Sequence, residues 1–313
     1  MSSELGPPTR SIVTGAGGWL GRALASELSR AKEPVRLSIL VEEERPDIQA
    51  LDPAAEVVVG DLLEAKILDE LFREAEGADL IHAASVIHPV DPADFRRVNV
   101  ELTRLLVDSA LASGVRRFVY VSSNSPFGFN ASRNDVFRSN EAYSPWLGYG
   151  RSKMEAELII QGLAGSGVEF VIVRPPWFYG PFQPTRQTEF FRTVRKGLFP
   201  VVGDGSNLRS MVAVDSLARG IRQAQLSEAA AGRSYWLSDA RPYEFREVVE
   251  TVKQALDLEG LASSKRIPRL PHAVSSLARL ADSALQQRGR YSQAIHVIGE
   301  LDMDIVCSPA DAV

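Results

Sequence analysis

A tyrosine and a lysine stand four residues apart in the segment Tyr149-Gly150-Arg151-Ser152-Lys153. On a helix, this spacing places the phenol and the ammonium on one face, one turn apart. A nearby cation lowers a tyrosine pKa from its ordinary value of about 10, so the phenol can exchange a proton with an alcohol near neutral pH. The pair predicts acid–base chemistry at a carbon that bears oxygen.

Two serines follow the strongly β-prone run Phe118–Val121. A hydroxyl at the carboxyl end of a parallel strand is well placed to bond a substrate oxygen, and Ser123 is our candidate. Serine also ends many strands as turn chemistry, and for Ser122 and Ser123 alone the two interpretations are equally good. With Tyr149 and Lys153, Ser123 makes a predicted catalytic triad.

A glycine-rich turn, TGAGGWLG, spans Thr14–Gly21. It follows the predicted strand Ser11–Val13 and opens the predicted helix Gly21–Ala31. This position between a strand and a helix is typical of a dinucleotide-binding turn, because the start of the helix offers N–H groups to a pyrophosphate.

Three glycines of the turn have separate tasks. Gly15 permits a tight turn, Gly18 lets the backbone approach the pyrophosphate, and Gly21 lets helix and strand pack closely. We also assign Trp19 and Leu20 to the cofactor site, although packing is the favoured interpretation for Trp19.

An acid at the end of the second strand would accept hydrogen bonds from a ribose and repel a 2′-phosphate. Glu42 is our choice for this position, which favours NAD over NADP. Arg36 or Arg45 would reverse the preference, so NADP stays an alternative. Glu43 and Glu44 are expected to form a solvated loop.

Short apolar runs alternate with longer amphipathic stretches, a pattern that predicts strand-helix-strand units and a parallel sheet. We therefore expect an α/β fold, a Rossmann-type doubly wound sheet with a smaller, mostly C-terminal substrate-binding lobe. The expected strands are Ser11–Val13, Val35–Val41, Glu56–Val59, Leu80–Ala83, Phe118–Val121 and Phe170–Val173, with a helix over Asn99–Ser113.

The alternation of strands and helices becomes less regular after Gly180, where prolines and the loop Gly203–Gly205 occur. We expect residues 1–180 to form the dinucleotide-binding domain and residues 181–313 mainly the substrate lobe. The two parts interleave through a late sheet strand near 209–215.

Composition excludes several classes of function. A net charge of −5 over 313 residues makes nucleic acid a poor partner and a small molecule a better one. One cysteine, Cys307, rules out a disulfide framework and a multi-cysteine metal site, and we predict no metal. Met1 to Arg10 lacks the apolar core of a signal peptide, and the apolar runs are too short to cross a bilayer, so we expect a soluble, cytoplasmic protein.

The motifs taken in order resemble the extended short-chain dehydrogenase/reductase superfamily. They are TGAGGWLG, Gly60-Asp61-Leu62, His82-Ala83-Ala84, Asn99, the VSS that ends strand five, YGRSK and Arg174-Pro175-Pro176 with Tyr179-Gly180-Pro181. Ser123, Tyr149 and Lys153 match the triad of the superfamily.

The resemblance implies further cofactor contacts. Asp61 and Leu62 would lie at the adenine, Pro175 would border the nicotinamide, Tyr149 and Lys153 would adjoin the cofactor, and Ala83, Ala84 and Asn99 would line or support the site. Each of these residues also has a purely structural interpretation. Asp61 and Asn99 would cap helices, His82 would be a hydrogen-bonded strand histidine, and the prolines would end a strand. The resemblance also implies a homodimer through the helices of the Asn99 and Tyr149 segments.

The second half bears on the substrate. Arg209 lies in a segment similar to one that gives nucleotide-sugar enzymes an arginine for the substrate diphosphate. The order of Gly203-Asp204-Gly205-Ser206-Asn207, Val214-Asp215 and the helix Phe245–Leu256 looks more like the 3β-hydroxysteroid dehydrogenase branch, which acts on apolar substrates. The residues assigned to the substrate are Ser85, Asn124, Trp177, Phe178 and Arg209, and Phe127, Phe129 and Trp146 would either wall the pocket or join the core.

A basic amphipathic helix is expected between Lys265 and Arg290, where Asp282 is the single acid. Its apolar face would consist of Leu270, Val274, Leu277, Ala281 and Leu285. It either packs as a lid over the active site, the favoured interpretation, or makes peripheral contact with a membrane. Residues Asp304–Cys307 look like a final strand, after which relatives have a further helical segment, so we expect an incomplete or trimmed substrate lobe.

The leading hypothesis is an NAD(P)-dependent dehydrogenase or ketoreductase that moves hydride between the nicotinamide and a secondary alcohol or ketone. A nucleotide-sugar epimerase would use the same first oxidation and return the hydride internally. A dehydratase is the weaker variant, because Asn124-Ser125 replaces the Asp-Glu pair of such relatives. A non-catalytic dinucleotide-binding protein would be favoured by loss of a triad residue, and none is lost.

Overall fold

The computed structural model describes residues 6–312; Met1 to Leu5, at the start of the segment without a signal-peptide core, lie outside the described residues. A parallel sheet of seven strands forms the centre, in the order β11-β6-β5-β4-β1-β2-β3. These strands are rich in Val and Ile and mostly buried, as expected for a sheet covered on both faces. Their bounds are β1 (Ser11–Thr14), β2 (Val35–Ile39), β3 (Glu56–Val59), β4 (Asp79–His82), β5 (Arg117–Val121), β6 (Glu169–Arg174) and β11 (Arg233–Trp236).

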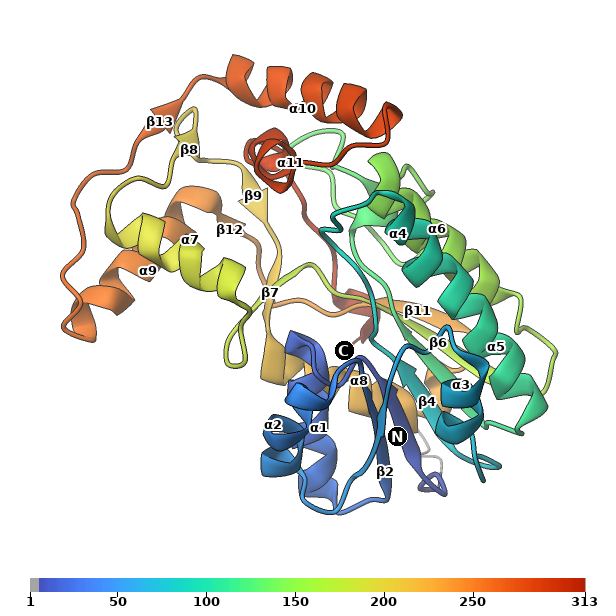
Figure 1. The fold of residues 1–313 in the computed structure, drawn as a ribbon. Coiled ribbons are helices and arrows are strands. Elements are labelled where there is room, and N and C mark those ends of the chain that lie inside the picture. Colours follow the sequence, from blue (N-terminus) through green and yellow to red (C-terminus); the bar gives the residue numbers. More distant parts are fainter. Residues whose placement is uncertain (1–5, 313) are drawn as a thin grey trace.

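Helices cover the two faces of this sheet in separate layers (Figure 1). One layer contains α1 (Trp19–Ala31), α2 (Arg45–Leu51) and α8 (Val214–Leu226). The other contains α3 (Ala65–Leu71), α4 (Ala93–Arg96), α5 (Leu102–Ala112) and α6 (Leu147–Gln161). The predicted Rossmann-type doubly wound fold is therefore confirmed.

Smaller elements lie beyond the carboxyl ends of the strands (Figure 1). They pack around an apolar cluster that includes Val194, Val201 and Phe245. Their bounds are β7 (Trp177–Tyr179), α7 (Thr185–Arg195), β8 (Val201–Val202), β9 (Leu208–Arg209), β10 (Met211–Ala213), β12 (Tyr243–Glu244), α9 (Phe245–Leu258), β13 (Arg269–Leu270), α10 (His272–Gln287) and α11 (Gln293–Glu300).

The late strands differ from the prediction. The strand expected near 209–215 is present as β10, but it pairs with β7 outside the central sheet, and β11 is the late strand that joins the sheet. Residues Asp304–Cys307 form no strand. Ile305 and Cys307 instead make isolated bridges to two different segments, at Arg209 and Phe137, so no single neighbour supplies a ladder.

The second strand is also shorter than predicted. It ends at Ile39 rather than Val41, and Leu40 and Val41 are exposed. A 3₁₀ turn at Glu42–Glu44 follows and leads into α2. The three glutamates therefore lie in a turn that directs them to different sides.

The predicted basic helix exists as α10 and lies across α11 on the outside of the molecule (Figure 1). Its buried residues are Ser275 and Asp282, whereas Leu277 is 65% exposed. The apolar face that we predicted is thus not the face that packs, because Asp282 has a partner on α11. Within residues 6–312, no helix is long and apolar enough to cross a membrane.

Candidate active site

The glycine turn Thr14–Gly21 brings three backbone segments closer than side chains would permit. Gly15 has a φ of +72°, and a Cβ on it would lie 2.7 Å from Cα of Ala84, at the end of β4. A Cβ on Gly21 would lie 2.1 Å from the carbonyl oxygen of Gly15. Both approaches require glycine, because a Cβ essentially never comes within 3.0 Å of such atoms.

The start of α1 fits the pyrophosphate of a dinucleotide. Gly18 is the N-cap residue, no described side chain caps the helix, and its first turn contains no acid. The N–H groups and the positive end of the helix dipole are therefore available at the glycine turn, which suits an anion.

Trp19 connects this turn to the segment Phe178–Pro181 of the smaller lobe. Its indole Nε1 donates to the carbonyl oxygen of Pro181 at 2.6 Å, and its ring lies 4.8 Å from that of Phe178. These contacts favour packing as the main task of Trp19. They also occupy one side of Phe178, which we had assigned to the substrate.

Glu44, rather than Glu42, is the acid that lies against the glycine turn. The carboxyl carbon of Glu44 lies 2.3 Å from the position that a Cβ on Gly17 would take, and its Oε2 accepts from the backbone N–H of Leu40 at 3.1 Å. Glu42 is exposed and forms an ion pair with Arg45. Glu44, which we had expected to lie in a solvated loop, is therefore the glutamate that lies against the glycine turn.

Arg36 cannot reach a cofactor phosphate in this fold. Its side chain is fully buried, donates to Glu56 at 2.9 Å and donates to the carbonyl oxygen of Leu71 at 2.8 Å. The prediction that Arg36 could reverse the cofactor preference is therefore wrong, because β2 points this residue into the protein.

Asn99 clamps the loop after β4 to α6. Its Oδ1 accepts from the hydroxyl of Ser85 at 3.0 Å and from the N–H of Val86 at 2.9 Å. Its Nδ2 donates to the hydroxyl of Ser152 at 2.9 Å. Asn99 is almost completely buried and holds Ser85 in place at the predicted site.

His82 at the end of β4 is a buried, hydrogen-bonded strand histidine. Its Nδ1 lies 2.7 Å from the hydroxyl of Thr14 and its Nε2 lies 3.1 Å from that of Thr103. Burial, and after it the charge of Lys153, lowers the pKa of His82 to about 3. The ring therefore stays neutral and gives the site no cation.

The remaining predicted cofactor residues differ in what they contact. Asp61 accepts from the N–H of Leu63 at 3.0 Å and pairs with Arg97 at 2.9 Å. Leu62 is buried in the apolar core, and Pro175 is buried directly after β6.

Lys153 lies beneath the end of β5. Its Nζ donates to the carbonyl oxygen of Val121 at 2.7 Å and lies 4.4 Å from the centre of the Tyr120 ring. Burial lowers the pKa of Lys153 from 10.5 to about 7, and the charge of Glu157 opposes part of that shift. The ammonium therefore changes its charge near neutral pH.

Ser123 follows two residues after Val121, at the carboxyl end of β5. Its Oγ accepts from the N–H of Ser125 at 3.2 Å, which fixes the turn. α6 approaches this turn closely because position 150 is glycine: a Cβ there would lie 2.5 Å from the carbonyl oxygen of Ser125. The glycine inside YGRSK thus brings the Tyr149 helix onto the Ser123 strand end.

Tyr149 lines a small cavity together with Asn124 and Ser125 from this turn. Phe95 of α4 packs beside the phenol, with ring centres 6.0 Å apart. Two further residues of the cavity wall, His296 and Glu300, come from α11. Our sequence analysis did not select either of them.

Glu157 is a second residue that the sequence analysis missed. It is fully buried one turn after Lys153, and it forms an ion pair with Arg174 at 2.6 Å. It also accepts from the hydroxyls of Ser122 and Tyr143. Its spacing of four residues from Lys153 was the available signal, and this network holds α6 against β5 and β6.

The predicted substrate residues do not all meet at one place. Arg209 is buried, and its guanidinium donates to the backbone carbonyl of Glu300. Burial lowers the pKa of Arg209, although an arginine remains charged. Trp177 packs against Phe190 and Phe245 in the core of the smaller lobe. Only Asn124 of this group is part of the Tyr149 cavity.

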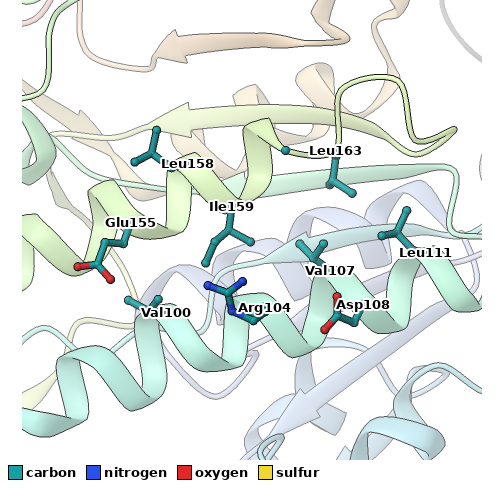
Figure 2. A pocket seen from close by; sticks show the side chains of 10 residues that line it. Val100, Arg104, Val107, Asp108, Leu111, Glu155, Leu158, Ile159 and Leu163 are labelled. Atoms are coloured by element: carbon teal, nitrogen blue, oxygen red, sulfur yellow. The ribbon is translucent and has the colours of Figure 1, made fainter.

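A hollow of about 510 Å³, much larger than the Tyr149 cavity, lies elsewhere. Figure 2 shows it between α5 and α6, with Val107, Leu111 and Leu158 along the groove and Arg104 near Ile159. None of the predicted triad residues lines this groove, so it is not a candidate for the catalytic pocket.

Comparisons with known proteins agree with this arrangement. The model of the NAD dependent epimerase/dehydratase family matches residues 11–236. An uncharacterized protein, y4nL, of Sinorhizobium fredii is 42% identical over 95% of this chain and 86% of its own length. A 3 beta-hydroxysteroid dehydrogenase/Delta 5→4-isomerase of Mycobacterium tuberculosis is 30% identical over 82% of this chain and 70% of its own length.

Solved structures support the fold. The UDP-glucuronic acid 4-epimerase of Bacillus cereus in complex with NAD superposes with a TM-score of 0.71 at 20% identity, over 84% of this chain and 87% of that chain. The matched model covers both the glycine turn and the Tyr149–Lys153 helix. The chain belongs to the NAD-dependent epimerase/dehydratase family.

Proposed function

We propose that this protein is an NAD-dependent dehydrogenase or ketoreductase that acts on a secondary alcohol or ketone. The observation that carries the proposal is the joint placement of three groups. Lys153 bonds the end of β5, Ser123 stands two residues farther along, and Gly150 lets the Tyr149 helix pack on that same turn.

In the direction of oxidation, the phenolate of Tyr149 takes the proton of the substrate hydroxyl and becomes the neutral phenol, while the hydroxyl of Ser123 orients the oxygen. Lys153 stabilises the phenolate by its charge and would hold the ribose of the cofactor. NAD, when bound, would supply the acceptor for the hydride. The buried Glu157–Arg174 pair keeps α6 in place during this exchange.

We further propose that Glu44 selects NAD. A carboxylate against Gly17 is placed to accept from ribose hydroxyls and to repel a 2′-phosphate. Glu42 has an exposed position and a partner in Arg45, so it is the weaker candidate. NADP would require Glu44 to turn away from the cradle.

An epimerase is the second candidate, supported by the family to which the chain belongs. It would return the hydride to the same substrate, so no net NADH would form. The buried position of Arg209, bonded to a backbone carbonyl, gives this candidate no support from a diphosphate contact. A purely dinucleotide-binding role is disfavoured, because all three triad side chains are present.

The test of the main proposal is Tyr149→Phe in an NADH oxidation assay with a panel of ketones. We expect a loss of about 100-fold or more in turnover with unchanged affinity for NAD, because only the proton transfer is removed. Tyr235→Phe, whose phenol contacts only the carbonyl of Ala229 among described residues, is the matched control. Full turnover by Tyr149→Phe would contradict the proposal.

We also propose a homodimer through α5 and α6. The groove in Figure 2 is lined mostly by apolar side chains, together with the charged residues Arg104, Asp108 and Glu155. Its residues Leu111 and Leu158 are 42% and 49% exposed. A second copy that lays the same two helices across this groove would bury these side chains in a symmetric contact.

We also propose how the chain divides into two parts and in which compartment the protein works. We place the dinucleotide-binding domain at residues 1–180 and the substrate lobe at 181–313, with β11 returned to the central sheet. A single, buried cysteine supports the reducing cytoplasm.

A further inference from the structure

A buried histidine–aspartate pair lies beside the candidate catalytic tyrosine. Nδ1 of His296 on α11 lies 2.7 Å from Oδ2 of Asp282 on α10, and both side chains are at most 10% exposed. Asp282 is the single acid of the basic helix, and this pairing explains why α10 buries it. Neither residue lies within the segment matched by the family model.

A hydrogen-bond chain connects this pair to the helix that carries Tyr149. Gln286 donates to Oδ1 of Asp282 at 3.0 Å and accepts from the backbone N–H of Gly148 at 3.0 Å. Gly148 directly precedes Tyr149. The position of His296 is thereby fixed relative to the candidate catalytic phenol.

His296 and Glu300 form one wall of the Tyr149 cavity, one helical turn apart on α11. The cavity measures about 10 Å³, which is the space of one water molecule or one substrate oxygen. Nε2 of His296 lies 3.6 Å from Oε1 of Glu300, too far for a hydrogen bond. An oxygen atom between them could bond to both.

The groups around His296 determine its charge. Burial alone would lower its pKa, but the hydrogen bond to Asp282 and the charges of Glu300 and Asp282 outweigh burial and raise the pKa. The rings of His88 and Tyr291 pack beside it, with centres 6.2 Å and 5.6 Å away. The raised pKa favours the protonated ring, in which Nε2 of His296 is a donor beside the carboxylate of Glu300.

These two groups select the chemistry of what they contact. A hydroxyl satisfies both, because it accepts from His296 and donates to Glu300. A carboxylate would be repelled by Glu300, and a hydrocarbon would offer no hydrogen bond to Nε2 of His296 or to Oε1 of Glu300, at a cost in free energy.

We propose that His296 and Glu300 form a subsite for a second hydroxyl of the substrate, so that the substrate is a vicinal hydroxy ketone or diol rather than a simple ketone. This inference rests on the proposed hydride chemistry at Tyr149. It assigns His296 and Glu300 to substrate binding, with Asp282 as the residue that positions His296.

The test compares NADH-dependent reduction of cyclohexanone and of 2-hydroxycyclohexanone. For each protein, the ratio of kcat/KM for the hydroxy ketone to kcat/KM for cyclohexanone is measured, and comparison among proteins cancels the intrinsic reactivity of the two ketones. We expect His296→Gln and Glu300→Gln each to lower this ratio by about tenfold or more relative to the wild type.

His272→Gln is the control, because this histidine of α10 also faces an aspartate, Asp302, but is exposed and outside the cavity. Its ratio should equal that of the wild type. Circular dichroism verifies that each variant folds. If His296→Gln does not fold, the test rests on Glu300→Gln, which replaces a side chain that is 32% exposed. Equal ratios in the wild type and the folded variants would overturn the subsite. Absence of NADH oxidation with both ketones in the wild type would instead overturn the proposed function, and the subsite with it.

Discussion

Replacing Lys153 with methionine should change how the stability of the protein depends on pH. The side chain is 1% exposed, and burial lowers its pKa from 10.5 to about 7. Between these two values the unfolded chain binds more protons than the folded chain. The free energy of unfolding of the wild type therefore rises with pH over this window, and full destabilisation by this group is reached below pH 7.

The size of the effect follows from the two pKa values. At pH 7 the penalty from Lys153 is about 4 kcal/mol, and at pH 9 it is about 2 kcal/mol. The wild type should thus gain about 2 kcal/mol between pH 7 and pH 9 that Lys153→Met does not gain. Methionine loses the hydrogen bond to Val121, but that loss is the same at both pH values.

Urea unfolding followed by circular dichroism at pH 7 and pH 9, for both proteins, measures this difference. Titrating groups away from Lys153 act equally in the two proteins, among them Cys307, whose pKa burial raises to about 11. His82, whose pKa the charge of Lys153 helps to lower, is buried and neutral at both pH values. Lys153→Met should also lose hydride transfer, so that a gain in stability relative to wild type at pH 7 accompanies a loss of activity. Parallel changes in stability with pH would refute the reasoning, because they would mean that Lys153 keeps an ordinary pKa.

Three further predictions concern the cofactor and the assembly. Gly21→Ala should abolish NAD binding measured by calorimetry, since its Cβ would lie 2.1 Å from a backbone oxygen, whereas Gly6→Ala, which has open space, should bind normally; normal binding by Gly21→Ala would contradict the close approach. Glu44→Gln should reduce the preference for NAD over NADP by about tenfold in direct titrations, and Glu42→Gln should not; the opposite pattern would restore Glu42 to the site. Leu158→Glu should convert a dimer to a monomer in light scattering, because it places a charge in the apolar groove between α5 and α6; an unchanged mass would exclude that interface.

The sequence allowed the sheet to be predicted well, because buried parallel strands are nearly continuous apolar runs. Glu56–Val59 is found at its predicted bounds, and Phe118–Val121 begins one residue earlier in β5. Spacing also indicated that Tyr149 and Lys153 share a helix. Such local patterns are visible in a single sequence.

The direction of individual side chains could not be predicted in the same way. Glu42, Glu43 and Glu44 are chemically identical, so the sequence alone does not tell them apart. The 3₁₀ turn that they form directs Glu44 toward the glycines, whereas Glu42 pairs with Arg45. Arg36 likewise enters the protein because β2 directs it there.

Contacts between separate helices could not be predicted from the sequence for a related reason. The sequence marked Asp282 only as the single acid of a basic helix, and His296 had no motif around it. Their contact depends on how α10 and α11 cross, which hydrophobic periodicity does not specify. The same limitation led us to assign the wrong face of α10 to the interior.

The central claim is that the glycine turn and the Ser123–Tyr149–Lys153 group form one site around a nicotinamide. A crystal structure of the protein with NAD tests it most directly. We expect the pyrophosphate against Gly15–Gly18, the adenine ribose at Glu44, and the nicotinamide beside Pro175 with its reactive carbon facing Tyr149 and Ser123. A structure in which NAD binds elsewhere, or in which the nicotinamide faces away from Tyr149, would contradict the claim.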